Sequence, residues 1–252
     1  MLFTMMNRIA ELNIPMCLPI EFDKCDEGVY TIQSWINGID LVSILPLSAK
    51  TSLPAQIQYA LGRQAGIIAK KIHSIPILKP NEEWSIHFNR EIDTIVLKYH
   101  ECGLHFDGDK TILDYINNNR FLLENRPFSF LVWDYNVLNM MYENDSVQII
   151  DFEYFNIGDP WKEFDCIFWS AMASPYFATG QINGYFDGKP PKAFFKLLAF
   201  YSSILLLSLM TSWAIESDVG QGVALKLSQD MLIWYDNMQN DVPTWYLKNL
   251  NY

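Results

Sequence analysis

Three polar residues in the middle of this chain have the types and the spacing that phosphoryl transfer requires. Asp134 and Asn139 lie five residues apart, and Asp151 follows an apolar segment further along. A carboxylate can accept the proton of a hydroxyl that attacks phosphorus, and an amide oxygen and a second carboxylate can hold the magnesium ions that bridge nucleotide phosphates. The spacing therefore indicates a site for metal-assisted phosphoryl transfer.

The segments around these residues predict a hairpin that would bring them together. We expect a short strand over Val137–Tyr142, a turn over Glu143–Ser146, and an apolar strand over Val147–Ile150 that ends at Asp151. A spacing of five residues between Asp and Asn also occurs by chance, and an Asp at the end of a strand can be only a turn former. The full order of loop, strand, turn, strand and Asp-Phe-Glu is far more specific than either fragment.

The same segment, with Gly158-Asp159-Pro160-Trp161 and Asp165, resembles the aminoglycoside phosphotransferase and choline kinase group of small-molecule kinases. The resemblance covers most of the chain, and it includes Asn13-Ile14-Pro15, Asn37-Gly38 and Ile72-His73-Ser74-Ile75-Pro76. It implies an α+β, protein-kinase-like fold of the aminoglycoside phosphotransferase type, with a truncated small β lobe and a mainly helical large lobe. We expect residues 1–38 to be the remnant of the N-terminal lobe with its hinge, and residues 39–252 to be the helical C-terminal lobe with the catalytic hairpin.

The resemblance also implies roles for individual residues. Asp134 would be the catalytic base, and Asn139 and Asp151 would bind Mg²⁺. Asp165 would be a buried acid that braces the catalytic loop. The hinge would face the adenine of ATP through four residues, namely Gln33, Ser34, Trp35 and Ile36.

Other polar residues near these motifs have weaker assignments. Glu153 either reaches a second metal ion or is only hydrogen-bonded near the turn. One of Asp159, Glu163 and Asp165 is expected to bind the substrate. His73 ends a predicted helix, where capping is the expected role rather than catalysis.

The catalytic loop departs from the pattern of the family, which usually reads His-Gly-Asp-x-His-x-x-Asn, with a second glycine directly before the Asn. The two histidines are replaced by Val132 and Asn136, and glycines are replaced by Trp133 and Leu138. Glycine permits a positive φ or a close approach of the backbone. The substitutions therefore predict a changed loop path or a crowded substrate site.

The start of the chain is the second departure. Kinases of this group begin with strands that carry a phosphate-covering loop and a lysine that pairs with the phosphates. No glycine precedes Gly28, and the earliest lysine, Lys24, lies in a polar turn. These residues predict a shortened small lobe.

Composition limits the classes of function. The chain has 252 residues, half of them apolar, and a net charge of −11. This charge disfavours nucleic acid as a partner and suits a cationic small molecule. The four cysteines have neither metal-ligand nor disulfide-framework spacing, and no secretory signal is visible, which indicates reduced thiols in a cytoplasmic protein.

Most of the remaining chain has a helical pattern. Helices are expected over Thr4–Leu12, over residues 52–72, over Glu82–Cys102 and over Thr111–Leu123, with strands over Met16–Phe22 and Val29–Trp35. After Pro160 we expect helices interrupted at Pro175, at Gly180–Pro191 and at Ser217–Gly222. Leu197–Ile215 contains no charge and approaches the length of a membrane span. Its Ser and Thr residues, and the absence of flanking basic clusters, favour a buried core helix.

Two functional hypotheses from different classes follow. The first is an ATP-dependent phosphotransferase that acts on a hydroxyl of a small, cationic molecule such as an aminoglycoside or an amino alcohol. The second is a degenerate, non-catalytic kinase-like protein that binds a ligand or partner. The substitutions in the loop and at the chain start favour the second hypothesis, whereas the retention of Asp134, Asn139 and Asp151 favours the first.

Overall fold

The computed structural model describes residues 2–46, 52–152, 154–248 and 250. Glu153 lies outside these residues, so its expected role has no structural counterpart. Contacts divide the chain into two compact units. The first contains residues 1–78, 129–190 and 247–252, and the second contains residues 79–128 and 191–246. The lobe boundary expected at residue 38 stays a prediction.

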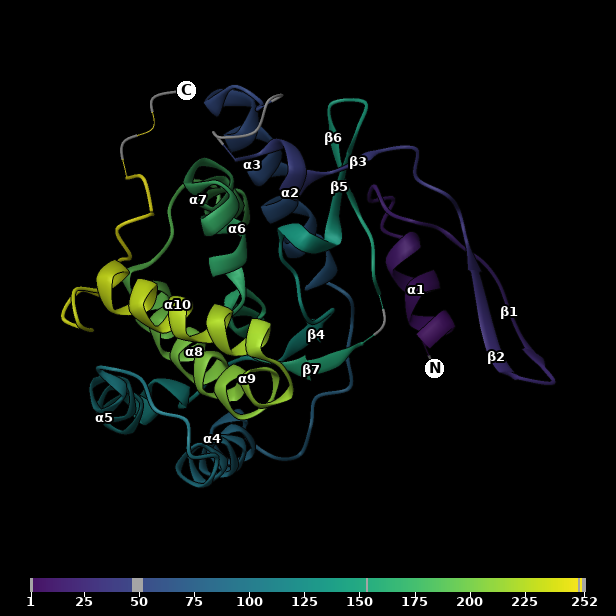
Figure 1. The fold of residues 1–252 in the computed structure, drawn as a ribbon. Helices are drawn as coiled ribbons and strands as arrows, with labels where there is room; N and C mark the ends of the chain where they lie inside the picture. Colours follow the sequence, from purple (N-terminus) through teal and green to yellow (C-terminus); the bar gives the residue numbers. More distant parts are fainter. Residues whose placement is uncertain (1, 47–51, 153, 249, 251–252) are drawn as a thin grey trace. The chain divides into compact units, whose positions relative to one another are not determined.

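The first unit begins with a helix and a hairpin. Helix α1 (Leu2–Ala10) precedes strands β1 (Pro19–Cys25) and β2 (Gly28–Gln33), which pair antiparallel around a tight turn (Figure 1). The predicted helix and both predicted strands are therefore present, with ends shifted by a few residues. Between α1 and β1 the chain pairs with a distant strand, since the amide of Cys17 donates to the carbonyl of Ile149 at 3.2 Å and the amide of Ile149 donates to Pro15 at 3.0 Å.

A three-stranded antiparallel sheet contains the predicted catalytic hairpin. Its order is β3 (Ile39–Asp40), β5 (Met140–Glu143) and β6 (Ser146–Ile149). Asn144 and Asp145 turn the hairpin with φ values of 50° and 60°, the pair of positive angles that a two-residue hairpin turn prefers. A second, two-stranded sheet pairs β4 (Ser129–Leu131) with β7 (Asn156–Gly158).

The strand predicted over Val137–Tyr142 is wrong in its first half. Residues Val137–Asn139 form a short 3₁₀ helix, η2, and the strand starts only at Met140. The side-chain oxygen of Asn136 accepts the amide of Leu138 at 2.9 Å, so Asn136 caps a helical turn at the point where strand pairing was expected.

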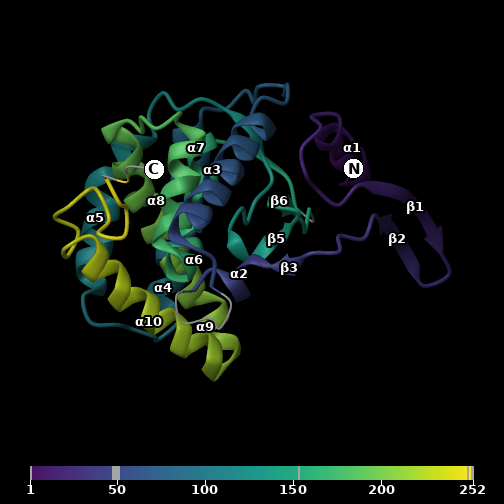
Figure 2. The same cartoon turned by 90° about the horizontal axis from the view of Figure 1, so that it is seen from above.

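Two long helices form the centre of the first unit. Helix α3 (Ala55–Ile72) and helix α7 (Pro175–Tyr185) run side by side (Figure 2). A Cβ added at Gly62 would lie 2.0 Å from the carbonyl oxygen of Phe177, and one added at Gly66 would lie 2.0 Å from that of Gln181. Glycines on both helices therefore let the two backbones touch.

Two glycines of α7 lie equally close to the backbone of α3, and one of them shows where a predicted helix break is wrong. A Cβ at Gly180 would lie 2.3 Å from the carbonyl oxygen of Tyr59, and one at Gly184 would lie 2.2 Å from that of Arg63. The helix break expected over Gly180–Pro191 is present only after Tyr185, because Gly180 lies inside α7, where packing against α3 requires the missing side chain. The break expected at Pro175 is present, since Ser174 caps the helix and Pro175 occupies its first turn.

The apolar face of α3 follows the predicted period except at its start. Leu61, Ala65, Ile68 and Ile72 are buried in the core of this unit, as expected. The helical period also places Ile57 on this face, but Ile57 is 42% exposed, so this part of the prediction is wrong. The remaining elements of the unit are α2 (Leu41–Ile44), η3 (Pro160–Phe164) and α6 (Ile167–Ala173).

The second unit is helical. It contains α4 (Trp84–Glu101), α5 (Asp109–Asn119), η1 (Arg120–Leu123), α8 (Lys192–Thr211), α9 (Trp213–Glu216) and α10 (Asp218–Trp234). By length and composition, one described helical stretch, Lys192–Glu216, could cross a membrane, but 72% of its most apolar part is buried inside the protein. Helices α4, α5 and α10 all pack against α8, which is the arrangement of a core helix.

The contact between α3 and α7 yields a stability prediction. Gly66→Ala should lower the free energy of unfolding by roughly 1–3 kcal/mol or more, because the new methyl group would overlap a backbone oxygen that cannot rotate away. Gly222→Ala in α10 is the matched control, because a Cβ there meets nothing within 4 Å. The control should be stabilising by about 0.5–1 kcal/mol, the helix-propensity gain of alanine. Equal unfolding midpoints in urea for both variants would contradict this account.

Candidate active site

The loop between β4 and β5 has an unusual backbone at its centre. Trp133 and Asp134 are consecutive residues with φ values of 56° and 55°, and Asp151 after β6 has a φ of 64°. Residues other than glycine seldom adopt this left-handed conformation, and each such residue costs about 1–3 kcal/mol. Two features of the site, the loop and the end of β6, therefore depend on surrounding structure that holds them in place.

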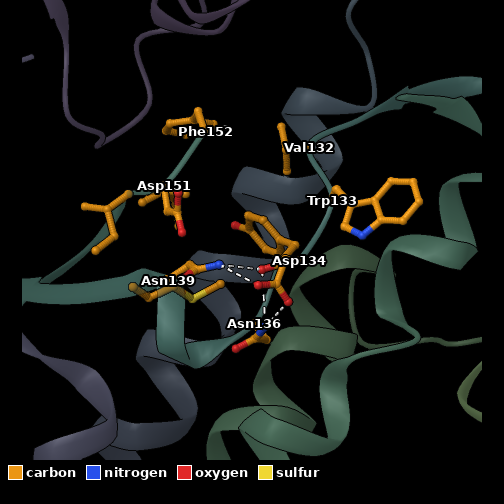
Figure 3. Close-up of a pocket in the computed structure, with 11 residues that line it drawn as sticks. Val132, Trp133, Asp134, Asn136, Asn139, Asp151 and Phe152 are labelled. Carbon is orange, nitrogen blue, oxygen red and sulfur yellow. Dashed lines mark hydrogen bonds between the residues drawn. The ribbon is translucent and has the colours of Figure 1, made fainter. Parts of the chain in front are cut away.

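Asp134 is held by two side-chain amides (Figure 3). The nitrogen of Asn136 donates to one carboxylate oxygen at 2.7 Å, and the nitrogen of Asn139 donates to the other at 3.0 Å. Asn139 also donates to the main-chain oxygen of Asp134 at 3.0 Å. Because the amide nitrogen of Asn139 is engaged by Asp134, its oxygen is the atom available to a metal ion.

Asp151 completes the set of three predicted residues. It lines the same small pocket as Asp134 and Asn139, and its carboxylate points toward Asn139 (Figure 3). The amide of Ile150 donates to the carbonyl of Asn139 at 3.1 Å, which fixes the two strands at this end of the hairpin. The hairpin thus brings together all three residues that the sequence singled out.

The donor set fits magnesium bound together with phosphates. Within the described ranges, no group of three or more His, Cys, Asp or Glu residues could hold a metal ion. Mg²⁺ commonly uses one or two carboxylates together with substrate phosphates and water. The carboxylate of Asp151 and the amide oxygen of Asn139 match that requirement.

The environment of Asp134 disfavours its charged form. Burial raises the pKa of Asp134 above the usual value, and the negative charge of Asp151 raises it further. The hydrogen bonds from Asn139 and Asn136 act in the opposite direction and lower this pKa. A carboxyl with a raised pKa is a better proton acceptor than an ordinary aspartate.

The acid that braces the loop by a direct hydrogen bond is Glu163, which the sequence analysis had not assigned to this role. Its buried carboxylate accepts the backbone amide of Val132 at 2.8 Å and lies 3.3 Å from Nε2 of His73. Nδ1 of His73 lies 2.9 Å from the hydroxyl of Tyr185. His73 is the C-cap residue of α3, as predicted, since its amide donates to the carbonyl of Ala69 at 2.9 Å, and its buried side chain also joins this network.

Asp165, the brace predicted from the sequence, is also buried. Its carboxylate accepts a hydrogen bond from Nζ of Lys162 at 2.6 Å. Burial raises the pKa of Asp165, and the ammonium group of Lys162 opposes that shift. The two acids are two residues apart on one helical turn, a spacing from which the sequence alone could not tell which side chain faces the loop.

Further contacts tie the loop to the helices. The hydroxyl of Tyr135 donates to the carbonyl of Ala65 in α3 at 2.8 Å, and the side chain of Gln181 in α7 donates to the carbonyl of Tyr135 at 3.2 Å. The amide of Val137 donates to Ser170 in α6 at 3.1 Å. These contacts could not be predicted from the sequence, because they depend on how the helices pack.

The predicted hinge does not line the pocket of Asp134. Gln33 ends β2, and the main chain of Ser34 is paired with Leu18 at 2.8 Å. Trp35 is 88% exposed, whereas Ile36 is buried. The contribution of these four residues to nucleotide binding stays a prediction.

Comparison with known proteins decides the family. Residues 3–195 match the model of the phosphotransferase enzyme family, which is more than half of the chain. This chain belongs to the phosphotransferase enzyme family. No curated protein sequence matches this chain.

Similar solved structures show the fold of this chain. A choline/ethanolamine kinase family protein from Mesorhizobium loti superposes with a TM-score of 0.65 at 14% identity, over 93% of this chain and 79% of that chain. A thermostable variant of aminoglycoside phosphotransferase APH(4)-Ia, in ternary complex with AMP-PNP and hygromycin B, gives a TM-score of 0.63 at 17% identity, over 90% and 78%. APH(2")-IIa in complex with gentamicin gives 0.55 at 19% identity, over 95% and 78%. The predicted protein-kinase-like fold of the aminoglycoside phosphotransferase type is confirmed.

The brace at Glu163 can be tested without any assay of turnover. Glu163→Ala removes the partner of the buried amide of Val132 and of Nε2 of His73, so it should cost about 1–3 kcal/mol of stability. Amide hydrogen exchange in residues 132–139 should accelerate, because the loop loses its anchor. Glu82→Ala is the control, since Glu82 forms an exposed pair with Arg90, and it should leave exchange in the loop unchanged. If amide hydrogen exchange in residues 132–139 is unchanged in Glu163→Ala, Glu163 does not brace the loop.

Two substitutions near Asp134 should shift its pKa in opposite directions. In the metal-free protein, Asp151→Asn should lower the pKa of Asp134, because it removes a neighbouring negative charge. Asn139→Ala should raise that pKa, because it removes a hydrogen bond to the charged form. Titration of ¹³C-labelled aspartate followed by NMR, with a chelator present, would measure both shifts. Shifts of the same sign would refute this description of the pocket.

Proposed function

We propose that this phosphotransferase transfers the γ-phosphoryl group of ATP to a hydroxyl of a small molecule, with Asp134 as the general base. The observation that carries the proposal is the pocket in which Asp134, Asn139 and Asp151 meet. The raised pKa of Asp134 and its two amide donors support the same role, because they orient the carboxylate and increase its affinity for a proton.

The transfer itself needs little chemistry from the protein. The acceptor oxygen forms a bond to the γ-phosphorus while the bond from that phosphorus to the bridging oxygen of ADP breaks. The proton of the acceptor hydroxyl moves to Asp134. Mg²⁺, held by Asn139 and Asp151 together with the phosphates, would neutralise charge on the nucleotide. The remaining work is positioning, which the braced loop performs.

The nucleotide and the acceptor class rest on weaker support. Relatives of the same fold were crystallised with AMP-PNP or ADP, which supports ATP as the donor. The proposal that its adenine faces Gln33, Ser34, Trp35 and Ile36 rests on the family resemblance of the sequence. Gentamicin and hygromycin B in related structures, the choline/ethanolamine kinase relative and the net charge of −11 support a cationic aminoglycoside or amino alcohol.

A non-catalytic binding protein is the second candidate. It is favoured by Val132 and Asn136, which stand where the family usually has histidines, and by the bulk of Trp133 and Leu138 where glycines are expected. Asn136 nevertheless keeps a polar contact to the base at 2.7 Å, which favours retained catalysis.

Two measurements separate these candidates. Addition of ATP with Mg²⁺ at about 100 times its dissociation constant should stabilise the fold by roughly 2.7 kcal/mol. Asp151→Asn should remove this stabilisation, because it removes a metal ligand. Asp134→Ala should keep nucleotide binding but lower phosphoryl transfer to aminoglycosides or amino alcohols by ~10²–10⁴.

The control is Asp187→Ala, which removes an exposed aspartate that pairs with Lys70. It should leave both binding and transfer unchanged. Nucleotide binding without any transfer in the unmodified protein would favour the non-catalytic candidate. Transfer that survives Asp134→Ala would refute the assignment of the base.

A further inference from the structure

Asn136 lies two residues after the proposed base, is fully buried, and uses both ends of its side-chain amide. Its Nδ2 donates to a carboxylate oxygen of Asp134 at 2.7 Å, and its Oδ1 accepts the amide of Leu138 at 2.9 Å. A carboxamide has a donor and an acceptor on one short planar group, whereas a carboxylate has acceptors alone. The side chain of Asn136 therefore connects the base directly to the helical turn that follows it.

The main chain of Asn136 extends this connection to the proposed metal ligand Asn139. The carbonyl oxygen of Asn136 accepts the amide of Asn139 at 3.1 Å, within the turn η2. The amide of Asn136 donates to the main-chain oxygen of Asp134 at 2.9 Å. The base, the capping residue and the metal ligand are thus joined by hydrogen bonds within residues 134–139.

The two side-chain amides that hold Asp134 differ in what else they must do. Asn139 donates to one carboxylate oxygen at 3.0 Å, and it is also the residue whose own oxygen would face a metal ion. The side chain of Asn136 has no such second role toward the metal ion, and its contact with the other carboxylate oxygen is shorter, at 2.7 Å. The contact from Asn136 therefore holds the base in one direction with or without a metal ion.

From these contacts, and on the basis of the proposed function, we infer that Asn136 is a positioning residue for phosphoryl transfer. Its side-chain amide fixes the direction of the Asp134 carboxylate relative to the turn that carries Asn139. A general base accepts a proton only within hydrogen-bond reach of the reacting hydroxyl, so a carboxylate that rotates away loses its function. Asn136 stands where the family usually has histidine, and it supplies a donor to the base from this position.

Asn136→Thr separates the helix cap from the contact with the base. Threonine is also an N-cap residue, and the extended backbone of Asn136, with φ of −135° and ψ of 176°, suits a β-branched side chain. Its hydroxyl oxygen can accept the amide of Leu138, but a methyl group replaces the donor that points to Asp134. Asn136→Ser is a second variant with the same loss and less bulk, so an effect shared by both variants is not caused by crowding.

The direction of the carboxylate can be measured without substrate, nucleotide or metal ion. Three-bond NMR couplings to the carboxyl carbon of Asp134 report its χ1 rotamer in the isotope-labelled full chain. We expect the couplings of one rotamer in the unmodified protein, and couplings shifted toward the average of several rotamers in Asn136→Thr and Asn136→Ser. Amide exchange of Leu138 should stay slow in both variants, because the cap remains.

The same variants should lower kcat and leave nucleotide binding unchanged. ADP formation would be measured with ATP and Mg²⁺ and with gentamicin, hygromycin B or choline as the acceptor probe. A misplaced reacting group can cost about 10²-fold in rate, so kcat should fall by about that factor in both variants. The dissociation constant of ATP with Mg²⁺ should not change, because Asn139 and Asp151 keep their oxygens.

Asn119→Ser is the matched control. Asn119 is a partly buried asparagine of the other compact unit, and its Nδ2 donates to the carbonyl of Tyr115 at 2.8 Å. Its substitution removes a side-chain amide contact of similar length far along the chain from the loop. It should change neither the couplings of Asp134 nor kcat.

Two results would overturn the inference: an unchanged χ1 rotamer of Asp134 in both Asn136 variants, or a kcat in these variants equal to that of Asn119→Ser. Failure of the proposed function would look different. In that case the couplings of Asp134 would change in both Asn136 variants, but the unmodified protein would form no ADP with any of the three probes. The hold of Asn136 on the carboxylate would then stand, and its use in catalysis would fall with the proposed function.

Discussion

The backbone contact between α3 and α7 is the constraint on which the rest of the first unit depends. Gly62 and Gly66 on one helix, and Gly180 and Gly184 on the other, leave no space for a side chain at the crossing. Only at this short separation can α3 accept the hydroxyl of Tyr135 while α7 donates to the carbonyl of the same residue. The distance between α3 and α7 therefore determines the position of Tyr135, and with it the position of the neighbouring Asp134.

This arrangement explains how the loop retains a strained backbone. Two consecutive left-handed residues would relax in an isolated segment, because neither is glycine. Here the loop is anchored on both sides of the strained pair, by Glu163 at Val132 and by Ser170 at Val137. The anchors replace the conformational freedom that glycine usually provides, so the substitutions in the family pattern leave the base and its amide partners in one pocket.

The sequence predicted the parts of the site that depend on local order. Asp134, Asn139 and Asp151 could be found because a hairpin brings fixed positions together whatever surrounds it. The brace could not be found in this way, since Glu163 and Asp165 differ only in the direction in which they leave one helical turn. The break expected over Gly180–Pro191 begins later than predicted, because a glycine required by packing has the same local signature as a glycine that ends a helix. The 3₁₀ turn at Val137–Asn139 was missed because Asn136 caps it, in a segment whose apolar residues suggested a strand.

One further consequence concerns the order in which the chain can fold. Residues Pro15 and Cys17 pair with Ile149, only two positions before the proposed metal ligand Asp151. These two residues are therefore synthesised well before the strand that contains their hydrogen-bonding partner. Contacts between positions so far apart in sequence close a long loop, which slows their formation. The end of β6 that carries Asp151 is therefore expected to be among the last parts of the first unit to become ordered, after the local helices have formed.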